Sequence, residues 1–140
     1  VAVVRGAGGG SRAAGAVGGG CGALVTSGTT TGCVLQAPGG QGDGDATTSE
    51  GVWVYTAASA DPKPSVGALV NVAGTVAEFD GLTEITGPTL AAPSGASWCA
   101  FPGLAATPTV LALPTALSSD FEALEGMLVS AAAVAGSSVV

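Results

Sequence analysis

The stretch DGDATTSEGVWVYTAASADPKPSVGALVNVAGTVAEFDGLTEIT, from Asp43 to Thr86, contains the strongest structural signals of the chain. It reads as a polar Gly/Asp loop, a short strand, a Pro-marked crossing loop, a long bent strand and a tight turn into a further strand. This order is typical of a small, strongly coiled β-barrel.

The short strand, expected over residues 52–56, is defined by its side-chain alternation. Val52 and Val54 share one face and Trp53 and Tyr55 share the other, as the two-residue period of a strand requires. One face therefore belongs to the barrel core, and the aromatic face points away from it.

The long strand is expected from Leu69 to Phe79, and Gly74 interrupts its pattern. A glycine inside a strand indicates a bulge or a barrel corner. Asp80-Gly81 is a strong hairpin signal and leads into a strand over residues 82–85.

The flanking segments are less regular in sequence. On the N-terminal side we expect a leading strand at Val1–Val4, a loop near residues 8–15, a Gly-rich first barrel strand over 16–26 and a return strand over 32–37. On the C-terminal side, Gly87 to Pro114 contains five prolines and is expected to be largely irregular. A short helix capped by Ser119 or Asp120 and a final strand over residues 127–131 complete the prediction.

Composition argues against an independent nucleic-acid binder. The 140 residues, enough for one domain, carry a formal net charge of −7, and only 9% of them are charged. The cations are Arg5, Arg12 and Lys63, which do not form the clustered basic face that phosphate binding requires. An acidic, weakly charged chain rich in Ser, Thr and Gly is more typical of an extracellular, secreted module.

No run of 18 continuous apolar residues is present, so we expect no membrane span. The chain begins at Val1 without a Met and ends at Ser138-Val139-Val140 in a strand-like pattern. We therefore expect a single domain over residues 1–140 that is processed from, or is an excerpt of, a longer secreted protein.

Three cysteines, Cys21, Cys33 and Cys99, lack the spacing of a zinc site. Cys21 and Cys33 are symmetric about Ser27, so they could face each other across a hairpin. One disulfide among the three, formed in an oxidising compartment, is one hypothesis, and three small buried thiols is the other.

Several segments resemble the OB-fold-like domain attached to extracellular bacterial nucleases of the endonuclease/exonuclease/phosphatase superfamily. The resemblance covers most of the chain and is most specific over residues 34–86 and 118–129. It departs at residues 37–41 and 94–101, and no nuclease domain is present. The matching segments are Leu35-Gln36, Thr48-Ser49-Glu50-Gly51, Val66-Gly67, Gly74-Thr75-Val76, Glu78, Gly81-Leu82-Thr83 and Glu125-Gly126-Met127-Leu128-Val129.

The resemblance implies an all-β fold, namely a small OB-like Greek-key barrel with one short helix and a Pro-rich irregular segment. OB-folds stack bases on exposed aromatic side chains, so Trp53 and Tyr55 are candidate binding residues, with Arg5 as a minor anion contact. The alternative is that the Pro-rich segment, including Trp98 and Phe101, covers this aromatic face as a second small core.

Carboxylates suggest two other sites. Asp43, Asp45 and Glu50 lie in a Gly-rich loop and are hard oxygen ligands suited to Ca²⁺, although their spacing is not that of an EF-hand, and a solvated turn is the simpler interpretation. The other group, Glu78, Asp80 and Glu84, surrounds the predicted hairpin turn, where we expect solvated carboxylates rather than acid–base catalysts.

The chain contains no His, which excludes Ser–His and Cys–His catalysis, and no enzyme is predicted. Two functions are left. The first is a cofactor-free OB-like module of a secreted nuclease-like protein, in contact with other domains of the same polypeptide and binding nucleic acid weakly or not at all by itself. The second is a structural subunit of an extracellular assembly or filament, whose identical neighbours pair through strand edges at Val1–Val4 and Val134–Val140.

Overall fold

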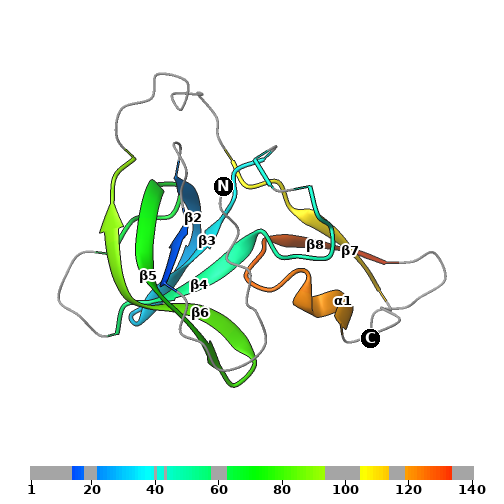
Figure 1. Cartoon of the computed structure of the whole chain (residues 1–140). Helices are drawn as coiled ribbons and strands as arrows, with labels where there is room; N and C mark the ends of the chain where they lie inside the picture. Colours follow the sequence, from blue (N-terminus) through cyan, green and yellow to red (C-terminus); the bar gives the residue numbers. More distant parts are fainter. Residues whose placement is uncertain are drawn as a thin grey trace.

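The computed structural model describes residues 14–17, 22–39, 41–42, 44–57, 63–93, 105–113 and 119–133. Within these residues the chain forms a β-barrel, from one side of which a small second sheet and a helical turn project (Figure 1). The elements are β1 (Ala14–Val17), β2 (Ala23–Gly28), β3 (Gly32–Gln36), β4 (Gly51–Tyr55), β5 (Leu69–Phe79), β6 (Leu82–Ala91), β7 (Thr109–Leu113), α1 (Ser119–Glu122) and β8 (Val129–Ala133).

Five strands close into a ring. β2, β3 and β4 form an antiparallel meander, β4 pairs parallel with β6, and β6 pairs antiparallel with β5. The ring closes where β5 pairs antiparallel with β2. Closure removes most free sheet edges, as in OB-folds. The prediction of an all-β, small OB-like barrel is therefore confirmed.

The core of the barrel is aliphatic. Val25, Leu35, Val54 and Ile85 each have 0% of their surface exposed, and they come from four different strands of the ring. Because each strand has a two-residue period, one apolar residue in two is enough to fill a barrel of this size. The inward direction predicted for Val52 and Val54 is confirmed, with exposed fractions of 8% and 0%.

The corner at Gly74 is confirmed and explains how Pro88 fits into a strand. The register of β5 and β6 shifts between Ala73 and Thr75, and a Cβ on Gly74 would lie 2.9 Å from the Thr86 carbonyl oxygen. Two residues of β6, Gly87 and Pro88, lie opposite the single residue Gly74, so the extra residue is on β6, where the ladder is interrupted and the missing N–H of Pro88 does not cost a ladder hydrogen bond.

The Pro-rich segment is consequently less irregular than the sequence predicted. β6 runs to Ala91 instead of ending at Ile85, and β7 forms a further strand before Pro114. At the other end of β6 the predicted hairpin is confirmed: Asp80 and Gly81 have φ of 52° and 86°, the left-handed pair that a tight two-residue turn requires.

The N-terminal prediction of one long strand over residues 16–26 is wrong. Two separate strands, β1 and β2, lie one after the other along β5, with Val17 opposite Val72 and Ala23 opposite Val70. The break has a local cause at Gly22, whose φ of +76° is outside the strand region. The predicted strands at Val1–Val4 and Val134–Val140 lie outside the described residues.

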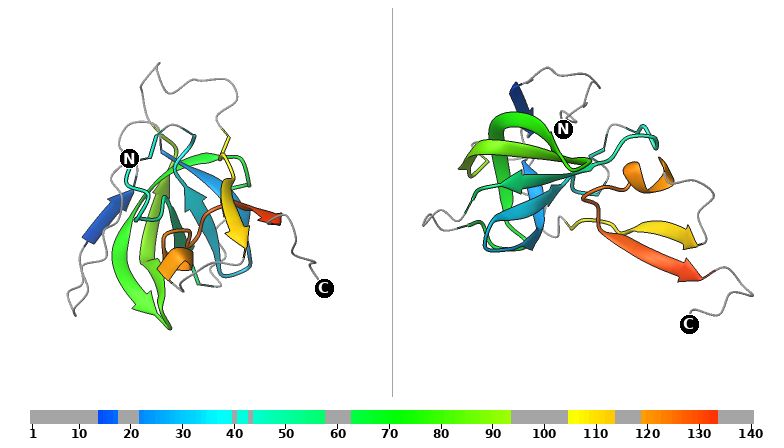
Figure 2. Two further views of the ribbon diagram at one scale, coloured as in Figure 1. Left: turned by 90° about the vertical axis from the view of Figure 1, so that its right-hand side faces the viewer. Right: turned by 90° about the horizontal axis from the view of Figure 1, so that it is seen from below.

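The C-terminal strand begins two residues later than predicted, at Val129, because the residues before it are used in a turn. The Met127 amide donates to the Leu124 carbonyl, and the Leu128 amide donates to Oε1 of Gln36 at 2.8 Å. β8 then pairs parallel and in register with β7 over five residues. The right-hand view of Figure 2 shows this two-stranded sheet outside the barrel.

Candidate functional site

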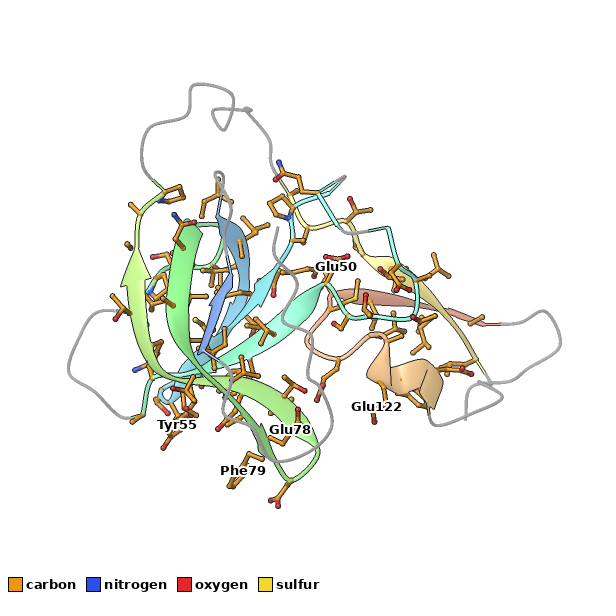
Figure 3. The ribbon with its side chains drawn as sticks, in the orientation of Figure 1. Glu50, Tyr55, Glu78, Phe79 and Glu122 are labelled. Atoms are coloured by element: carbon orange, nitrogen blue, oxygen red, sulfur yellow. The ribbon has the colours of Figure 1, made fainter. Side chains whose placement is uncertain are left out.

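The candidate site is the outer face of β4. Trp53 is half-buried and Tyr55 has 41% of its surface exposed, so both side chains lie outside the barrel core, as predicted. Figure 3 shows Tyr55 at the end of β4 that lies farther from α1, whereas Glu50 lies at the beginning of the strand. Trp53 is directly opposite Val34 of β3, which gives the face an apolar centre.

A glycine makes room for the indole. A Cβ on Gly32 would lie 2.5 Å from Cζ2 of Trp53, so the ring packs over the start of β3 where no side chain stands. This contact holds one face of the indole against the protein. Tyr55 is the register partner of Gly32. It is the more accessible of the two aromatic groups and is therefore better placed to contact a ligand.

Lys63 is a cation that the sequence did not single out for this site. Burial raises the pKa of the Cys33 thiol, and the positive charge of Lys63 acts in the opposite direction and lowers it. In the sequence it belongs to the predicted Asp61-Pro-Lys-Pro64 crossing segment, which comes after β4 in the chain.

The interpretation of the hairpin carboxylates as solvated is correct for two of them and wrong for the third. Glu78 and Asp80 are exposed, and Oε1 of Glu78 accepts a 2.6 Å hydrogen bond from the Thr83 hydroxyl. Glu84, by contrast, has only 8% of its surface exposed and lies beside Trp53 in the parallel β4–β6 pair. Glu84 has a strand on each side, with Trp53 of β4 and Ala77 of β5 as its register partners, whereas Asp80 lies in the hairpin turn and Glu78 close to it.

The calcium hypothesis stays a prediction. Oδ1 of Asp45 accepts hydrogen bonds from the Thr47 amide at 3.0 Å and the Thr47 hydroxyl at 2.6 Å, which is the geometry of a side-chain-stabilised turn. Asp43 lies outside the described residues. Within those residues, no three His, Cys, Asp or Glu side chains come together as a metal site would need.

The loop before β4 contacts the segment 125–128, which we call the strap. The Ser49 hydroxyl donates to the Glu125 carbonyl, and the Glu50 amide points at Sδ of Met127 at 3.5 Å. Gly51 and Gly126 face each other so closely that a Cβ on Gly51 would lie 2.8 Å from the Met127 nitrogen. No pattern in the sequence predicts the contact between these two segments.

The Glu125 carboxyl, at this junction, has a raised pKa. Burial is the main cause that raises the pKa of its carboxyl, and the negative charges of Glu122 and Glu78 raise it further. A hydrogen bond from the Thr83 backbone acts in the opposite direction. The strap therefore also lies close to the β5–β6 hairpin, so it connects the beginning of β4 with the end of the barrel sheet.

A pocket of about 400 Å³ lies between the loop before β4, the β7 strand and the turn after α1. Its wall combines apolar groups with Asp45, Thr48 and Glu50, and Gln36 lies at its base next to the strap. The remaining lining residues are Ala37, Pro38, Gly39, Gly42, Gly44, Ala46, Thr107, Thr109, Ala123, Leu124 and Met127.

The disulfide hypothesis is wrong for Cys33. Its thiol is free, its exposed fraction is 0%, and the register of the β2–β3 hairpin places Gly28 opposite it rather than Cys21. The symmetry about Ser27 failed because the hairpin turns at residues 29–31 and a bulge shifts the register between Val25 and Ser27. Cys33 is a small buried thiol, the alternative interpretation.

Other predicted site residues, namely Arg5, Cys21 and Cys99, lie outside the described residues, as do Trp98 and Phe101, which were expected to cover the aromatic face. None of the described helical residues makes a segment with the length and apolar character of a membrane span. Comparison of the chain with known protein families, with curated proteins and with solved structures finds no match.

Proposed function

We propose that this chain is a non-catalytic OB-like module of a secreted, nuclease-like protein, in which it assists substrate binding or positions a neighbouring domain. The observation that supports the proposal is the outward-facing aromatic pair Trp53 and Tyr55 on β4, a central strand of a closed barrel. OB-folds contact bases and sugars through aromatic groups on this kind of surface.

Electrostatics limit what the module does alone. The net charge is −7, and Glu84 lies next to Trp53, so phosphates approach the face against a negative potential. Lys63 is the one cation among the described residues. We therefore expect weak binding of single-stranded nucleic acid, with a dissociation constant of about 10⁻⁴ M or weaker at physiological salt.

The test is a titration of fluorescently labelled single-stranded DNA with the chain, followed by anisotropy at low and physiological salt. Tyr55→Ala removes the accessible aromatic group of the face. Phe121→Ala is the matched control, because Phe121 is an aromatic residue with 49% exposure on α1, away from β4.

We expect Tyr55→Ala to weaken binding at low salt by about five- to thirtyfold, a loss of about 1–2 kcal/mol for one base stack, and Phe121→Ala to leave it unchanged. If the two variants bind single-stranded DNA with equal affinity, the β4 face does not take part in substrate binding, and only the positioning role is left. A low-micromolar dissociation constant at physiological salt, abolished by Trp53→Ala, would instead identify an autonomous nucleic-acid binder.

A second candidate function is a structural subunit that assembles through strand edges. It is favoured by the two-stranded β7–β8 sheet, which projects from the barrel and exposes apolar side chains, among them Val110 with 65% of its surface exposed. Exposed sheet edges of this kind are templates for pairing with another chain.

A further inference from the structure

The β7–β8 sheet lacks the environment that a parallel sheet normally has. Its two strands pair only with each other among the described residues, in register from Thr109↔Val129 to Leu113↔Ala133. Parallel sheets are usually covered on both faces, and a two-stranded sheet alone is marginally stable. Here Val110 is 65% exposed, Val129 40% and Leu113 37%. Among the described residues, the sheet therefore lacks the additional strands that normally stabilise a parallel sheet.

Among the described residues, β8 is the strand of this sheet with the more open edge. The segment leading into β7 is held against the barrel, because the Gly39 amide donates to the Ala105 carbonyl and Thr109 lines the pocket beside Leu124. In the right-hand view of Figure 2, β8 runs along the outer margin of the molecule, with β7 between it and α1. Ser130 and Ala131 are exposed.

The chemistry of β8 identifies the strand that fits it. Its sequence, Val129-Ser-Ala-Ala-Ala133, has no charge, proline or large side chain. Natural edge strands usually carry such blocking groups. In a chain of net charge −7, two copies repel each other over most of their surface, so an uncharged edge is the place where like copies approach at the lowest electrostatic cost.

We propose that β8 pairs antiparallel with β8 of a second copy of this chain, to give a four-stranded sheet in the order β7-β8-β8-β7. A two-fold axis through the middle of β8 makes the pairing self-complementary and closed, with Ala131 opposite its own copy. The small side chains on either side of the axis allow this register without clashes. The inference rests on the second candidate function and specifies the edge that it uses.

The test is sedimentation velocity on the whole chain from about 1 µM to about 1 mM, a range that detects dissociation constants typical of weak dimers. Ala131→Lys places two like charges opposite each other at the axis. Ala91→Lys is the matched control, because Ala91 is an exposed residue at the end of β6, across the barrel from β8 in Figure 1, and the change in net charge is the same.

We expect concentration-dependent dimers of the unmodified chain, a dissociation constant raised at least about tenfold by Ala131→Lys, and little change with Ala91→Lys. If Ala131→Lys weakens the dimer no more than Ala91→Lys does, the proposed pairing of β8 with β8 is wrong, while the structural role stands. If the chain stays monomeric over the whole concentration range, both the β8–β8 pairing and the structural role are wrong. The module function then remains as the proposal.

A second measurement covers the case in which Ala131→Lys does not fold. Hydrogen exchange of the unmodified chain is followed at low and high protein concentration, and Ala131→Val is compared with it, because a β-branched residue is favourable in a strand. The proposal requires slower exchange of β8 amides at high concentration and equal or stronger dimers of Ala131→Val. Exchange in β8 that does not depend on concentration would overturn it.

Discussion

Replacing Gly51 by Ala tests how the strap is attached to the barrel. Gly51 opens β4, and its Cα faces the peptide that joins Gly126 to Met127. An added Cβ would lie 2.8 Å from the Met127 nitrogen, closer than real Cβ contacts, and its neighbours are backbone atoms that cannot rotate away. The strap must therefore move outward.

The size of the effect follows from the bonds that this movement breaks. The strap is held by hydrogen bonds from the Ser49 hydroxyl to the Glu125 carbonyl and from the Leu128 amide to Gln36 Oε1. Each contributes a net ~0.5–1.5 kcal/mol, so losing both costs ~1–3 kcal/mol. Alanine offsets ~0.5–1 kcal/mol of this because it restricts the unfolded chain more than glycine. We expect a net loss of ~1–2 kcal/mol.

The assay is native-state hydrogen exchange at the Leu128 amide, combined with urea unfolding. A loss of ~1–2 kcal/mol corresponds to exchange that is about five- to thirtyfold faster. Gly28→Ala is the control, because Gly28 is also a strand residue and no atom lies within 4 Å of its added Cβ. Equal Leu128 exchange and equal unfolding midpoints for the two variants would refute the attachment of the strap through Gly51.

Leu35→Ala should lower the free energy of unfolding by ~2–5 kcal/mol in urea titrations, because Leu35 is fully buried, whereas Val66→Ala, at a residue 65% exposed, should change it by less than ~0.5 kcal/mol. Because the folded-state pKa of Glu125 is raised above its ordinary value of 4.5, the stability contributed by its protonation is fully present below pH 4.5 and is lost as the pH rises through the raised pKa. Glu125→Gln should flatten this part of the plot of unfolding free energy against pH. The change should be less than ~1 kcal/mol, because solvent screens a partly exposed carboxyl. An unchanged plot would contradict the raised pKa of Glu125. The Cys33 thiol should resist alkylation in the native protein, because burial raises its pKa, and react only after unfolding; peptide mapping that finds it modified in folded protein would show that the barrel opens there.

The barrel strands were predictable because their signals are local. The alternation of Val52 to Tyr55 fixes which face of β4 is buried, and Asp80-Gly81 supplies the two left-handed residues of the hairpin. Gly74 marked the corner of β5 for the same reason, since a bulge needs a residue without a side chain where another strand comes close.

The errors have non-local causes. The end of β6 was misplaced because Pro88 is tolerated only in the bulge of β6 that lies opposite Gly74 of β5. Glu84 is buried at a position where β4 and β5 flank β6, and the disulfide hypothesis for Cys33 failed because of a register shift in its hairpin partner. A pattern read along one segment does not contain the position of its neighbours.

The sequence by itself determined the all-β class, the barrel strands 52–56 and 69–79, the hairpin between β5 and β6, and the outward position of Trp53 and Tyr55, because alternation and turn chemistry act within a few residues. Only the tertiary structure decided that the barrel closes through a parallel β4–β6 pair, that the strap docks on Gly51, and that β7 and β8 form a separate sheet. These features arise from contacts between residues far apart in the chain. Their free energy depends on packing and register that no single segment encodes.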